Sequence, residues 1–598
     1  MEPERPSWKR FHRLNFSKKS LNKRVKKLEK GTMRHANKFV TNRLDRLSGV
    51  KRHISGWIVL VILLVGVSAT QWWTFRNSYT EASFASGGTF SEGVIGPLET
   101  LNPLLARSSA EKSASRLLFS SLYQYDSSGH LKGDLAKSMS VNETETEYTV
   151  VLKDNLKWSD QTELNAEDVV FTVNLLKNPE AHTEITGWDS IDAKLVDSKT
   201  VKFTLPAAYA PFIHSLTFPV LPQHSLENTP ASEIRESAYS KAPSVTSGPF
   251  SLRLVQDSTT DGTKKIVHMI ANPYYHGGLA KLERFQLYVY PSRDEIAKGL
   301  RINEIMSTPE LVYNEQTDQL KHIYTSVSYS VNDGVYALFN SQSPVLSSRT
   351  VRQALAYSVD VADLRSKISQ STEPLSGPVL STHVTGKLPD SPEYNIEKAK
   401  QLLDDDGWKL SGNSRSKGDQ KLSLSIVALK GSEYEEVSNM LAKIWREKLA
   451  IETEVRIVDP TDTSQNVLSS VLQPRNFDVL IYELVLGGDP DVYAYWHSSQ
   501  ATNRGLNFAN YSNTLSDDAL ESGRGRGTIK QRSDRYEIFA KQWQSDMPAL
   551  ALYQPKLDYI QLESVQTIDP SASLVYPTDR YANVIYWAVK KQQVYKTP

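Results

Sequence analysis

Residues 422–458, LSLSIVALKGSEYEEVSNMLAKIWREKLAIETEVRIV, contain two strand patterns separated by a helix pattern. The strand patterns cover residues 422–428 and 451–458, and residues 434–449 between them repeat apolar side chains at helical spacing. Parallel strands need a crossover connection, and that connection is usually a helix. The stretch therefore predicts an α/β protein with mainly parallel or mixed sheets.

The same alternation extends towards the amino terminus. Residues 146–153 (TEYTVVLK) and 200–205 (TVKFTL) alternate apolar and polar side chains as half-buried strands do. Residues 166–177 and 352–368 have helical spacing, and Ser348 stands ahead of the apolar positions of the second of these helices. Strands and helices thus alternate through most of the chain.

Length and composition narrow the class of protein. The chain has 598 residues, and a single hydrophobic core stops growing at roughly 250–300 residues. Hydrophobic residues make up 39% of the chain, with 11 Trp and 28 Tyr, which excludes disorder of the whole chain. The sequence has no Cys, which excludes thiolate metal sites, cysteine nucleophiles and a lipid anchor on an N-terminal Cys. We therefore expect more than one domain.

Charge is unevenly distributed around a net sum of +1. Residues 1–53 hold 17 Lys and Arg against four acidic residues, whereas residues 77–598 hold 51 basic against 64 acidic residues. Between them, residues 54–75 (ISGWIVLVILLVGVSATQWWTF) carry no charge. A basic end and an acidic body separated by an apolar stretch indicate two compartments.

The uncharged stretch predicts a single transmembrane helix over residues 54–76. Its length matches the roughly 20 apolar residues that cross a bilayer, and Trp57 and Trp72 lie near its ends, where aromatic rings favour the interface. The positive-inside rule places residues 1–53, the basic arm, in the cytoplasm and the C-terminal domain outside the cell membrane. Residues 77–90 are small and polar, which suggests a linker.

Two other interpretations of this region stay open. The apolar stretch would be a cleaved signal peptide with Val67-Ser68-Ala69 at its cleavage site, but the 53 residues ahead of it exceed the n-region of secretory signals. The basic arm would bind nucleic acid, but beside a membrane helix the simpler expectation is contact with anionic lipids of the inner leaflet. We therefore expect an uncleaved anchor and no nucleic-acid partner.

The motifs of common catalytic sites, HExxH, GxSxG, Walker A and GxGxxG, are absent from the sequence. Ser109-Ala-Glu-Lys112 formally matches an SxxK motif, but capping of a helix over residues 111–118 by Ser108 or Ser109 explains it better. Asp489-Pro-Asp491 would supply paired catalytic carboxylates, but capping and turn formation suit its loop position better. We expect no enzyme activity, no cofactor and no metal.

Short motifs occur in a fixed order over residues 85–590, and the most recognisable is Leu164-Asn-Ala-Glu-Asp-Val-Val-Phe171. The others are Leu101-Asn102-Pro103, Gly133-Asp-Leu-Ala136, Leu156-Lys-Trp-Ser-Asp160, Pro222-Gln-His224, Ser247-Gly-Pro-Phe250, Asn272-Pro-Tyr-Tyr275, Val351-Arg-Gln-Ala-Leu-Ala356, Gly407-Trp408 and Tyr495-Trp-His-Ser498. In number and order they resemble the family of oligopeptide-, dipeptide- and nickel-binding proteins that serve ABC importers, the bacterial extracellular solute-binding proteins of family 5.

The resemblance implies a two-lobed, type II periplasmic-binding-protein-like fold with an extra subdomain, which closes over its ligand by a hinge. The first lobe and the subdomain would cover residues 91–335 and the second lobe residues 336–540, and residues 541–598 would return to the first lobe. An extended peptide would lie between the lobes, where strand edges pair with its backbone.

The resemblance also implies where a ligand lies. Gly96-Pro97-Leu98 matches the family's segment whose backbone pairs with the ligand, and a second lining segment precedes Pro490. Peptide binders of the family have an Asp four residues before that Pro, which receives the ligand's ammonium group, but this chain has Leu486 there. Either Glu483 or Asp489 supplies the counter-charge that a buried ammonium needs, or the ligand has no free amino terminus.

Three aromatic residues follow this segment. Tyr493, Tyr495 and Trp496 would line a pocket for a ligand side chain, or they form an aromatic core at the start of a helix. The sequence alone does not separate these two roles.

These observations predict a membrane-anchored extracytoplasmic receptor. It would bind peptides or a similar solute as a monomer and deliver them to the permease of an ABC importer. The alternative is a membrane-anchored interaction or signalling protein that reuses the fold, because an arm of 53 residues is longer than an anchor needs. A hydrolase has no motif to support it.

Overall fold

The structure, a computed structural model, describes residues 51–595 apart from 259–261, 313–319, 321, 431–432 and 460–465, together with a few single positions between residues 26 and 38. The predicted basic arm therefore lies almost entirely outside the described residues. The chain divides into two compact units, residues 1–83 with 591–598, and residues 84–590.

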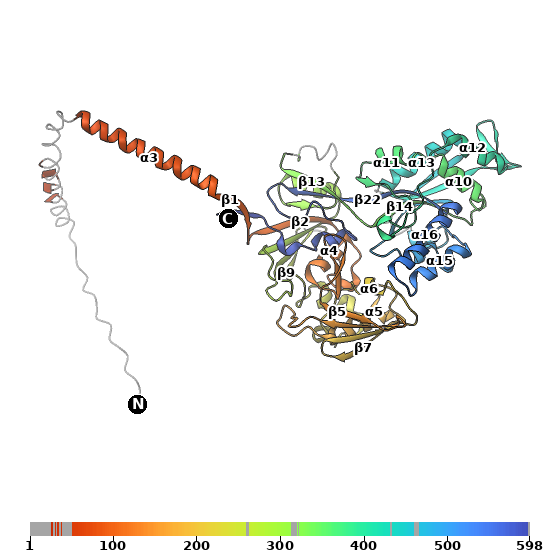
Figure 1. Ribbon diagram of the computed structural model, residues 1–598, viewed down its shortest axis with the longest axis horizontal. Coiled ribbons are helices and arrows are strands. Elements are labelled where there is room, and N and C mark those ends of the chain that lie inside the picture. The colour runs from red at the N-terminus through yellow and green to blue at the C-terminus, as the bar shows by residue number, and fades with distance from the viewer. Residues whose placement is uncertain are drawn as a thin grey trace. The chain divides into compact units, whose positions relative to one another are not determined.

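The first unit contains one long helix, α3 (Lys51–Tyr79) (Figure 1). Its part His53–Arg76 is long and apolar enough to cross a membrane, with a mean hydropathy of 2.0, and the rest of the protein does not bury it. Among the described residues it is the single helix of this kind. The predicted membrane helix of residues 54–76 thus lies inside a longer helix.

The expected linker of residues 77–90 is mostly regular structure. α3 continues to Tyr79, β1 (Thr80–Ala85) follows directly, and β2 begins at Thr89. β1 pairs with β23 (Lys590–Tyr595) in a sheet of two strands. A distant segment supplies the partner strand, and no local pattern of small polar residues reveals such a partner.

The second unit is built on a twelve-stranded mixed sheet. Its strand order is β20-β19-β21-β14-β22-β12-β2-β11-β10-β9, and β13 and β15 also pair with β22. The strands are β2 (Thr89–Ile95), β9 (Phe250–Asp257), β10 (Lys265–Ala271), β11 (Arg284–Tyr290), β12 (Ser307–Thr308), β13 (Tyr324–Ser330), β14 (Asp333–Phe339), β15 (Thr372–Glu373), β19 (Ser423–Leu429), β20 (Glu452–Val458), β21 (Val479–Val485) and β22 (Ala549–Leu562). The prediction of a mixed α/β architecture is confirmed.

We define the first lobe as the residues packed around a core that runs from Phe90 to Val289 and from Tyr559 to Trp587. Its outer part is an antiparallel sheet of order β5-β6-β8-β7, against which α5 packs. Its other elements, with the bounds of these, are α4 (Ser109–Leu118), β3 (Tyr123–Tyr125), β4 (Leu131–Gly133), β5 (Ala136–Val141), β6 (Glu147–Leu152), α5 (Ala166–Lys177), β7 (Asp192–Asp197), β8 (Thr200–Thr204), α6 (Phe212–Ser215), α7 (Gln223–Leu226), α8 (Ala238–Lys241) and α9 (Arg293–Arg301). We call the sheet β5-β6-β8-β7 with α5 the subdomain.

We define the second lobe as the residues packed around two further cores, whose side chains lie between Val335 and Tyr553. β19 pairs in parallel with both β20 and β21, and α13 (Glu433–Leu449) connects β19 to β20. The strand–helix–strand unit predicted for residues 422–458 is therefore confirmed. The other helices are α10 (Arg349–Tyr357), α11 (Val361–Ser366), α12 (Ile396–Asp405), α14 (Tyr493–Trp496), α15 (Thr514–Arg524) and α16 (Ile529–Asp546), and a small sheet comprises β16 (Lys409–Ser411), β17 (Ser414–Lys417) and β18 (Gln420–Lys421).

Two connections join the lobes. β22 pairs with β14 through residues 549–553, in the second lobe, and with β13 through residues 556–562, in the first. β13 and β14 follow each other with only Val331 and Asn332 between them (Figure 1). Because few residues cross, this junction is where a rotation of one lobe against the other would be absorbed. We call residues 330–333 the hinge segment.

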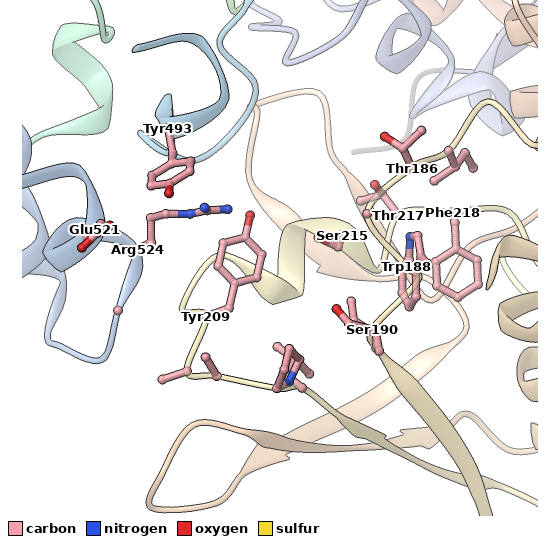
Figure 2. Close-up of a pocket in the computed structure, with 18 residues that line it drawn as sticks. Thr186, Trp188, Ser190, Tyr209, Ser215, Thr217, Phe218, Tyr493, Glu521 and Arg524 are labelled. Atoms are coloured by element: carbon pink, nitrogen blue, oxygen red, sulfur yellow. The ribbon is translucent and has the colours of Figure 1, made fainter. Parts of the chain in front are cut away.

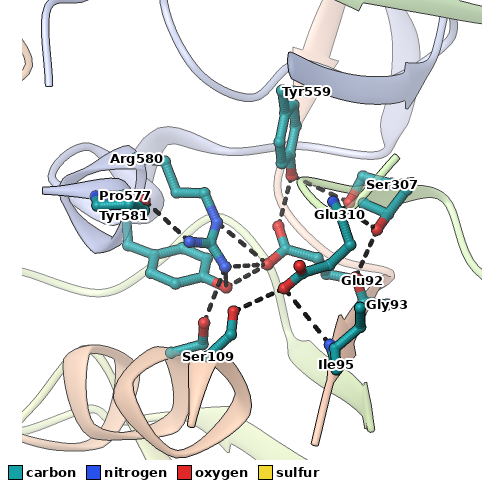
Figure 3. Close-up of polar contacts among 12 residues, drawn as sticks. Glu92, Gly93, Ile95, Ser109, Ser307, Glu310, Tyr559, Pro577, Arg580 and Tyr581 are labelled. Carbon is teal, nitrogen blue, oxygen red and sulfur yellow. Dashed lines mark hydrogen bonds and ion pairs between the residues drawn. The ribbon is translucent and has the colours of Figure 1, made fainter. Parts of the chain in front are cut away.

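A buried ion pair fixes the C-terminal segment to the first lobe. The Arg580 Nη2 atom lies 2.8 Å from Oε1 of Glu92, which sits on β2 with no exposed surface. Tyr559 of β22 donates a hydrogen bond of 2.6 Å to the other oxygen of Glu92, and Arg580 also donates to Ser113 of α4 (Figure 3). These bonds compensate the charges that the fold buries. The boundary residues predicted for the lobes stay predictions.

Several predicted helices agree with the structure and one does not. Ser108 caps α4, since its Oγ accepts from Glu111 N at 3.1 Å, so the SxxK match has a structural explanation. The single helix expected over residues 352–368 is two helices, because the Asp360 side chain accepts a hydrogen bond from Asp363 N and starts α11 anew.

Candidate ligand-binding cleft between the lobes

The segment of residues 483–493, from the end of β21 to the start of α14, faces the first lobe. The Tyr209 hydroxyl donates a hydrogen bond of 3.0 Å to Asp491 Oδ2, and His214 Nε2 lies 3.8 Å from Asp489 Oδ2. Tyr209 packs against the core of the first lobe, and His214 follows Ile213 of that core; both Asp residues precede Val492 of a second-lobe core. This segment is therefore part of the contact surface between the lobes.

Its start is attached to the hinge segment. Leu486 N and Gly487 N donate to Asn332 O at 2.9 and 3.1 Å, and the Asn332 side chain donates to Gly487 O at 2.8 Å. Gly487 has a φ of 63°, a backbone conformation that glycine adopts without a steric cost. A movement at the hinge is thus passed directly to the segment that meets the first lobe.

Asp489 already has a cation. Arg532 of α16 donates to its two carboxylate oxygens at 2.6 and 2.8 Å, in a bidentate pair with both side chains largely buried. Burial lowers the pKa of the neighbouring His214, which therefore brings no further charge at neutral pH. Of the two residues that the sequence offered as a counter-charge for a ligand, Asp489 is the one whose charge the protein itself compensates.

Glu483 is in a different position. It lies on β21 directly opposite Val335 of β14, and its carboxylate accepts a hydrogen bond of 2.6 Å from the Tyr434 hydroxyl. Burial raises the pKa of Glu483, so the charged form is disfavoured there. A neutral hydroxyl is the partner that the structure gives this acid.

Asp333, at the start of β14, is a buried acid near the half-buried Glu483. Its side chain is 7% exposed, and within the described part of the chain its Oδ1 atom has no hydrogen-bond partner. Burial, followed by the charge of Glu483, raises the pKa of Asp333 to about 8, against the opposing effect of Lys112 on α4. Sequence reasoning missed Asp333, although an acid inside the apolar run VNDGVYALF (residues 331–339) was a signal of a special role.

Leu486 belongs to a core. Its side chain is 3% exposed and packs with the apolar cluster of the second lobe. It therefore supplies packing at a position where a charge was expected for a peptide binder. Asp333, at the start of β14, and Glu483, near the end of β21, lie at the same end of these two adjacent strands.

Three backbone groups of the segment Gly96-Pro97-Leu98 already have partners in the protein. Gly96 N donates to Tyr290 O, Ser108 Oγ donates to Pro97 O at 2.6 Å, and Lys265 Nζ donates to Leu98 O at 3.2 Å. The segment lies in the first lobe next to α4, and Lys112 of that helix is the first-lobe charge that acts on Asp333. Its role in binding a ligand stays a prediction.

The three aromatic residues after the segment separate into two roles. Trp496 has no exposed surface and packs edge-to-face on Trp543 at 5.4 Å between ring centroids, so it lies in the aromatic core. Tyr495 donates a hydrogen bond of 3.0 Å to Val485 O. Tyr493 stacks on the His497 ring and faces Arg524, 4.2 Å from its ring centroid. Tyr493 also lines a cavity.

That cavity lies between the first lobe and the second and has a volume of about 730 Å³. One wall comes from residues 185–191 and 205–218 of the first lobe, and the other from Tyr493, Glu521, Arg524 and Gly525 of the second. Figure 2 shows the Arg524 side chain between the rings of Tyr493 and Tyr209. Because its two walls belong to different lobes, this cavity depends on the lobes being close together. We call it the interlobe pocket.

No group of three or more acidic, His or Cys side chains that could hold a metal ion occurs among the described residues. Four acids lie at or beside the interlobe segment: Glu483, Asp489 and Asp491 have neutral or cationic partners, whereas Asp333 has an oxygen without one among the described residues. Such an arrangement suits recognition of a solute.

Comparisons with known proteins agree on one family. The model for the middle region of the bacterial extracellular solute-binding proteins, family 5, matches residues 130–505. The chain is 26% identical over 518 residues to the oligopeptide-binding protein AppA of Bacillus subtilis, covering 83% of this chain and 92% of that protein. It is also 26% identical to protein XP55 of Streptomyces lividans, covering 75% and 80% of the two chains.

Solved structures share the fold. The substrate-binding protein CtaP of Listeria monocytogenes has a TM-score of 0.72 at 23% identity and covers 84% of this chain and all of its own. The structure of AppA from Bacillus subtilis with a nonapeptide has a TM-score of 0.67 at 23% identity, covering 85% of this chain and all of its own. These neighbours are two-lobed, as predicted. Because the family model matches residues 130–505, more than half of its length, the chain belongs to the bacterial extracellular solute-binding proteins of family 5.

Proposed function

We propose that this chain is a membrane-tethered receptor that binds peptides between its two lobes and delivers them to an ABC importer. Its family binds solutes outside the cell, and a similar protein is named for oligopeptides. α3 would hold the receptor at the membrane as a single-pass anchor with the basic arm in the cytoplasm, which raises its effective concentration near a permease. It would act as a monomer and without catalysis.

The observation that carries the proposal is the pair of acids at the hinge. Asp333 is buried and Glu483 half-buried at the same end of the strands β14 and β21, with no cation in ion-pair contact among the described residues, whereas Asp489 has Arg532. Burial disfavours the charged form of both acids, and the ammonium group of a peptide would supply the counter-charge that stabilises it. We therefore assign the ammonium of the ligand to Asp333 and Glu483, in place of the position that Leu486 occupies.

The lobes would close over the peptide by rotation at the hinge segment. The backbone of residues 96–98 in the first lobe and of residues 483–489 in the second would pair with the peptide backbone, which gives affinity that depends little on sequence. Excluding water would strengthen those hydrogen bonds.

Native mass spectrometry of the full chain in lipid nanodiscs tests the proposal. The chain is incubated with a defined pool of peptides of two to nine residues, washed and released into the spectrometer. We expect intact peptides to be retained at one per chain. Retention of no peptide would contradict the proposal, and recovery of shortened peptides would favour a hydrolase instead.

A further inference from the structure

Another cavity lies on the surface of the first lobe, where the chain that comes from α3 enters the lobe. Its volume is about 690 Å³, and its lining includes Ser86, Gly87, Arg253 of β9, Ile270 of β10 and residues 279–284. Gly87 N donates a hydrogen bond of 2.6 Å to Lys281 O, and Arg284 N donates one of 3.2 Å to Gly88 O. These bonds fix residues 279–284 against the entering chain. We call this cavity the entry groove.

Part of the entry groove is apolar and open to solvent. Leu279 is 66% exposed and Ile270 is 40% exposed. Leu254, which directly follows Arg253 on the edge strand β9, is also exposed. Apolar side chains that gather at one place on a surface, rather than scattering singly over it, mark a site of interaction.

The entry groove is also basic. It holds three basic side chains against the single acid Glu283, and that acid lies 3.1 Å from Arg284. Within the described part of the chain, no ion pair involves the other two cations, Arg253 and Lys281. This local excess opposes the overall charge of residues 77–598, which hold 51 basic against 64 acidic residues. The groove is therefore a place where an otherwise acidic receptor attracts anions.

The covalent chain keeps the entry groove near a membrane that α3 crosses. α3 ends at Tyr79, and Ser86 of the groove is seven residues further along the chain. Seven extended residues span at most roughly 25 Å. The headgroups of the outer leaflet are therefore within reach of this part of the first lobe.

We propose that the entry groove binds an anionic phospholipid of the outer leaflet. Arg253 and Lys281 receive its phosphate, since guanidinium and ammonium groups both bind phosphate oxygens. The first methylene groups of its acyl chains lie against Leu279 and Ile270. This inference rests on the part of the proposed function that makes α3 a membrane anchor. The contact holds the first lobe on the membrane and leaves the second lobe free to rotate at the hinge segment.

A single fluorescent label tests this inference in the full chain in nanodiscs. Because the chain has no Cys, Leu279→Cys offers a unique thiol for a bimane label, and Leu410→Cys on β16, 59% exposed, offers the control position. Nitroxides on the lipid headgroups quench bimane on contact. This local readout is needed because the basic arm also attracts anionic lipid.

The expected result is a lipid-dependent signal at one position. Each basic side chain near an anionic surface strengthens its attraction roughly fivefold. We therefore expect the label at residue 279 to be quenched at least about fivefold more in phosphatidylglycerol than in phosphatidylcholine nanodiscs. The label at residue 410 should be quenched equally in both.

Charge reversal separates the groove from the charge of the whole chain. Arg253→Glu combined with Lys281→Glu should remove the difference between the two lipids, whereas Lys194→Glu combined with Lys409→Glu, at exposed lysines outside the groove, should preserve it. Equal quenching in both kinds of nanodisc would overturn the inference and leave the anchor standing. A difference that survives reversal in the groove, in a chain whose thermal unfolding matches the wild type, would do the same. A chain that does not enter nanodiscs would overturn both.

Discussion

The two ends of the interlobe segment differ in how their acids are compensated. At the hinge end, among the described residues, the buried Asp333 has an oxygen without a hydrogen-bond partner and the half-buried Glu483 accepts a hydrogen bond from the Tyr434 hydroxyl. At the pocket end, Asp489 is paired with Arg532 and Asp491 with Arg524. The two ends therefore differ in what they offer a ligand. The acids at the hinge end can exchange a proton for a cationic group of the ligand, whereas the acids at the pocket end already have cations from the protein.

The same contrast separates stability from binding. Removing one partner of a buried ion pair leaves an unpaired charge, which destabilises the fold. Neutralising an acid that already lacks a partner instead removes the free-energy cost of burying that acid. Substitutions that remove the cation of an acid at the pocket end should therefore cost stability, and substitutions of the acids at the hinge end should cost affinity.

The largest effect is expected for Arg532→Met. This change leaves Asp489 buried without its cation, and we expect the free energy of unfolding to fall by about 3–5 kcal/mol. Urea denaturation followed by tryptophan fluorescence measures it. Lys530→Met on the same helix is the control, because its pair with Asp534 is exposed. A loss no larger than that of the control would show that the pair does not stabilise the fold.

Asp333→Asn should weaken binding without weakening the fold. Because the raised pKa of Asp333 means that its charged form opposes folding above pH 4, we expect the free energy of unfolding at pH 7 to stay equal or rise. We expect the affinity for peptides with a free amino terminus to fall by about 2 kcal/mol, or roughly thirtyfold, the size of a hydrogen bond between charged groups.

Calorimetric titration and urea denaturation of the same preparation check this prediction. Asp390→Asn, at an exposed acid, is the control and should change neither quantity. Full affinity in Asp333→Asn would mean that Asp333 does not meet the ligand.

The pH dependence of binding follows from the same residue. Asp333 faces Glu483 from β21, Lys112 from α4, Tyr495 from α14 and Tyr576, and in the empty protein its pKa is about 8. Below that pH the carboxyl holds a proton that a cationic ligand must displace. Affinity should therefore fall by up to about tenfold per unit as the pH is lowered from 7.5 to 5.5.

Titrations in two buffers of different ionisation enthalpy measure the proton released at pH 7. We expect nearly one proton per peptide from the wild type and much less from Asp333→Asn. Equal proton release from the two chains would assign the titration to another group.

The smallest effect is expected for Tyr209→Phe. This change removes the hydrogen bond across the lobes to Asp491 and keeps the ring that faces Arg524. Since a single hydrogen bond contributes about 1 kcal/mol, we expect affinity to fall roughly fivefold. Tyr148→Phe, whose hydroxyl bonds to Tyr209 O within the first lobe, is the matched control. A larger loss in the control than in Tyr209→Phe would contradict the role of this contact in closure.

Local patterns predicted most elements of the fold. The sequence predicted the helix over residues 166–177 and the strand–helix–strand unit of residues 422–458, because hydrophobic periodicity and caps are local properties. The pairing of β1 with β23 was not readable, since the two strands lie more than 500 residues apart. The break before α11 was missed because a capping Asp360 outweighed the helical spacing around it.

The candidate site was predictable only in part. The position of the interlobe segment and the departure at Leu486 were visible in the sequence, but the compensation of Asp489 by Arg532, 43 residues away, was not. Asp333 and the interlobe pocket arise from tertiary packing of both lobes, which no spacing along the chain encodes. The role of Trp496 could not be predicted for the same reason. The local sequence around an aromatic residue does not tell whether it lines a cleft or packs in a core.

The most direct test of the central claim compares one peptide with its N-acetylated twin, titrated calorimetrically into the wild-type chain in nanodiscs at pH 7.5. We predict that the free peptide binds at one per chain and that acetylation weakens binding at least tenfold, because Asp333 and Glu483 lose the ammonium that compensates them. Equal affinity for both peptides, or binding of neither, would contradict the account.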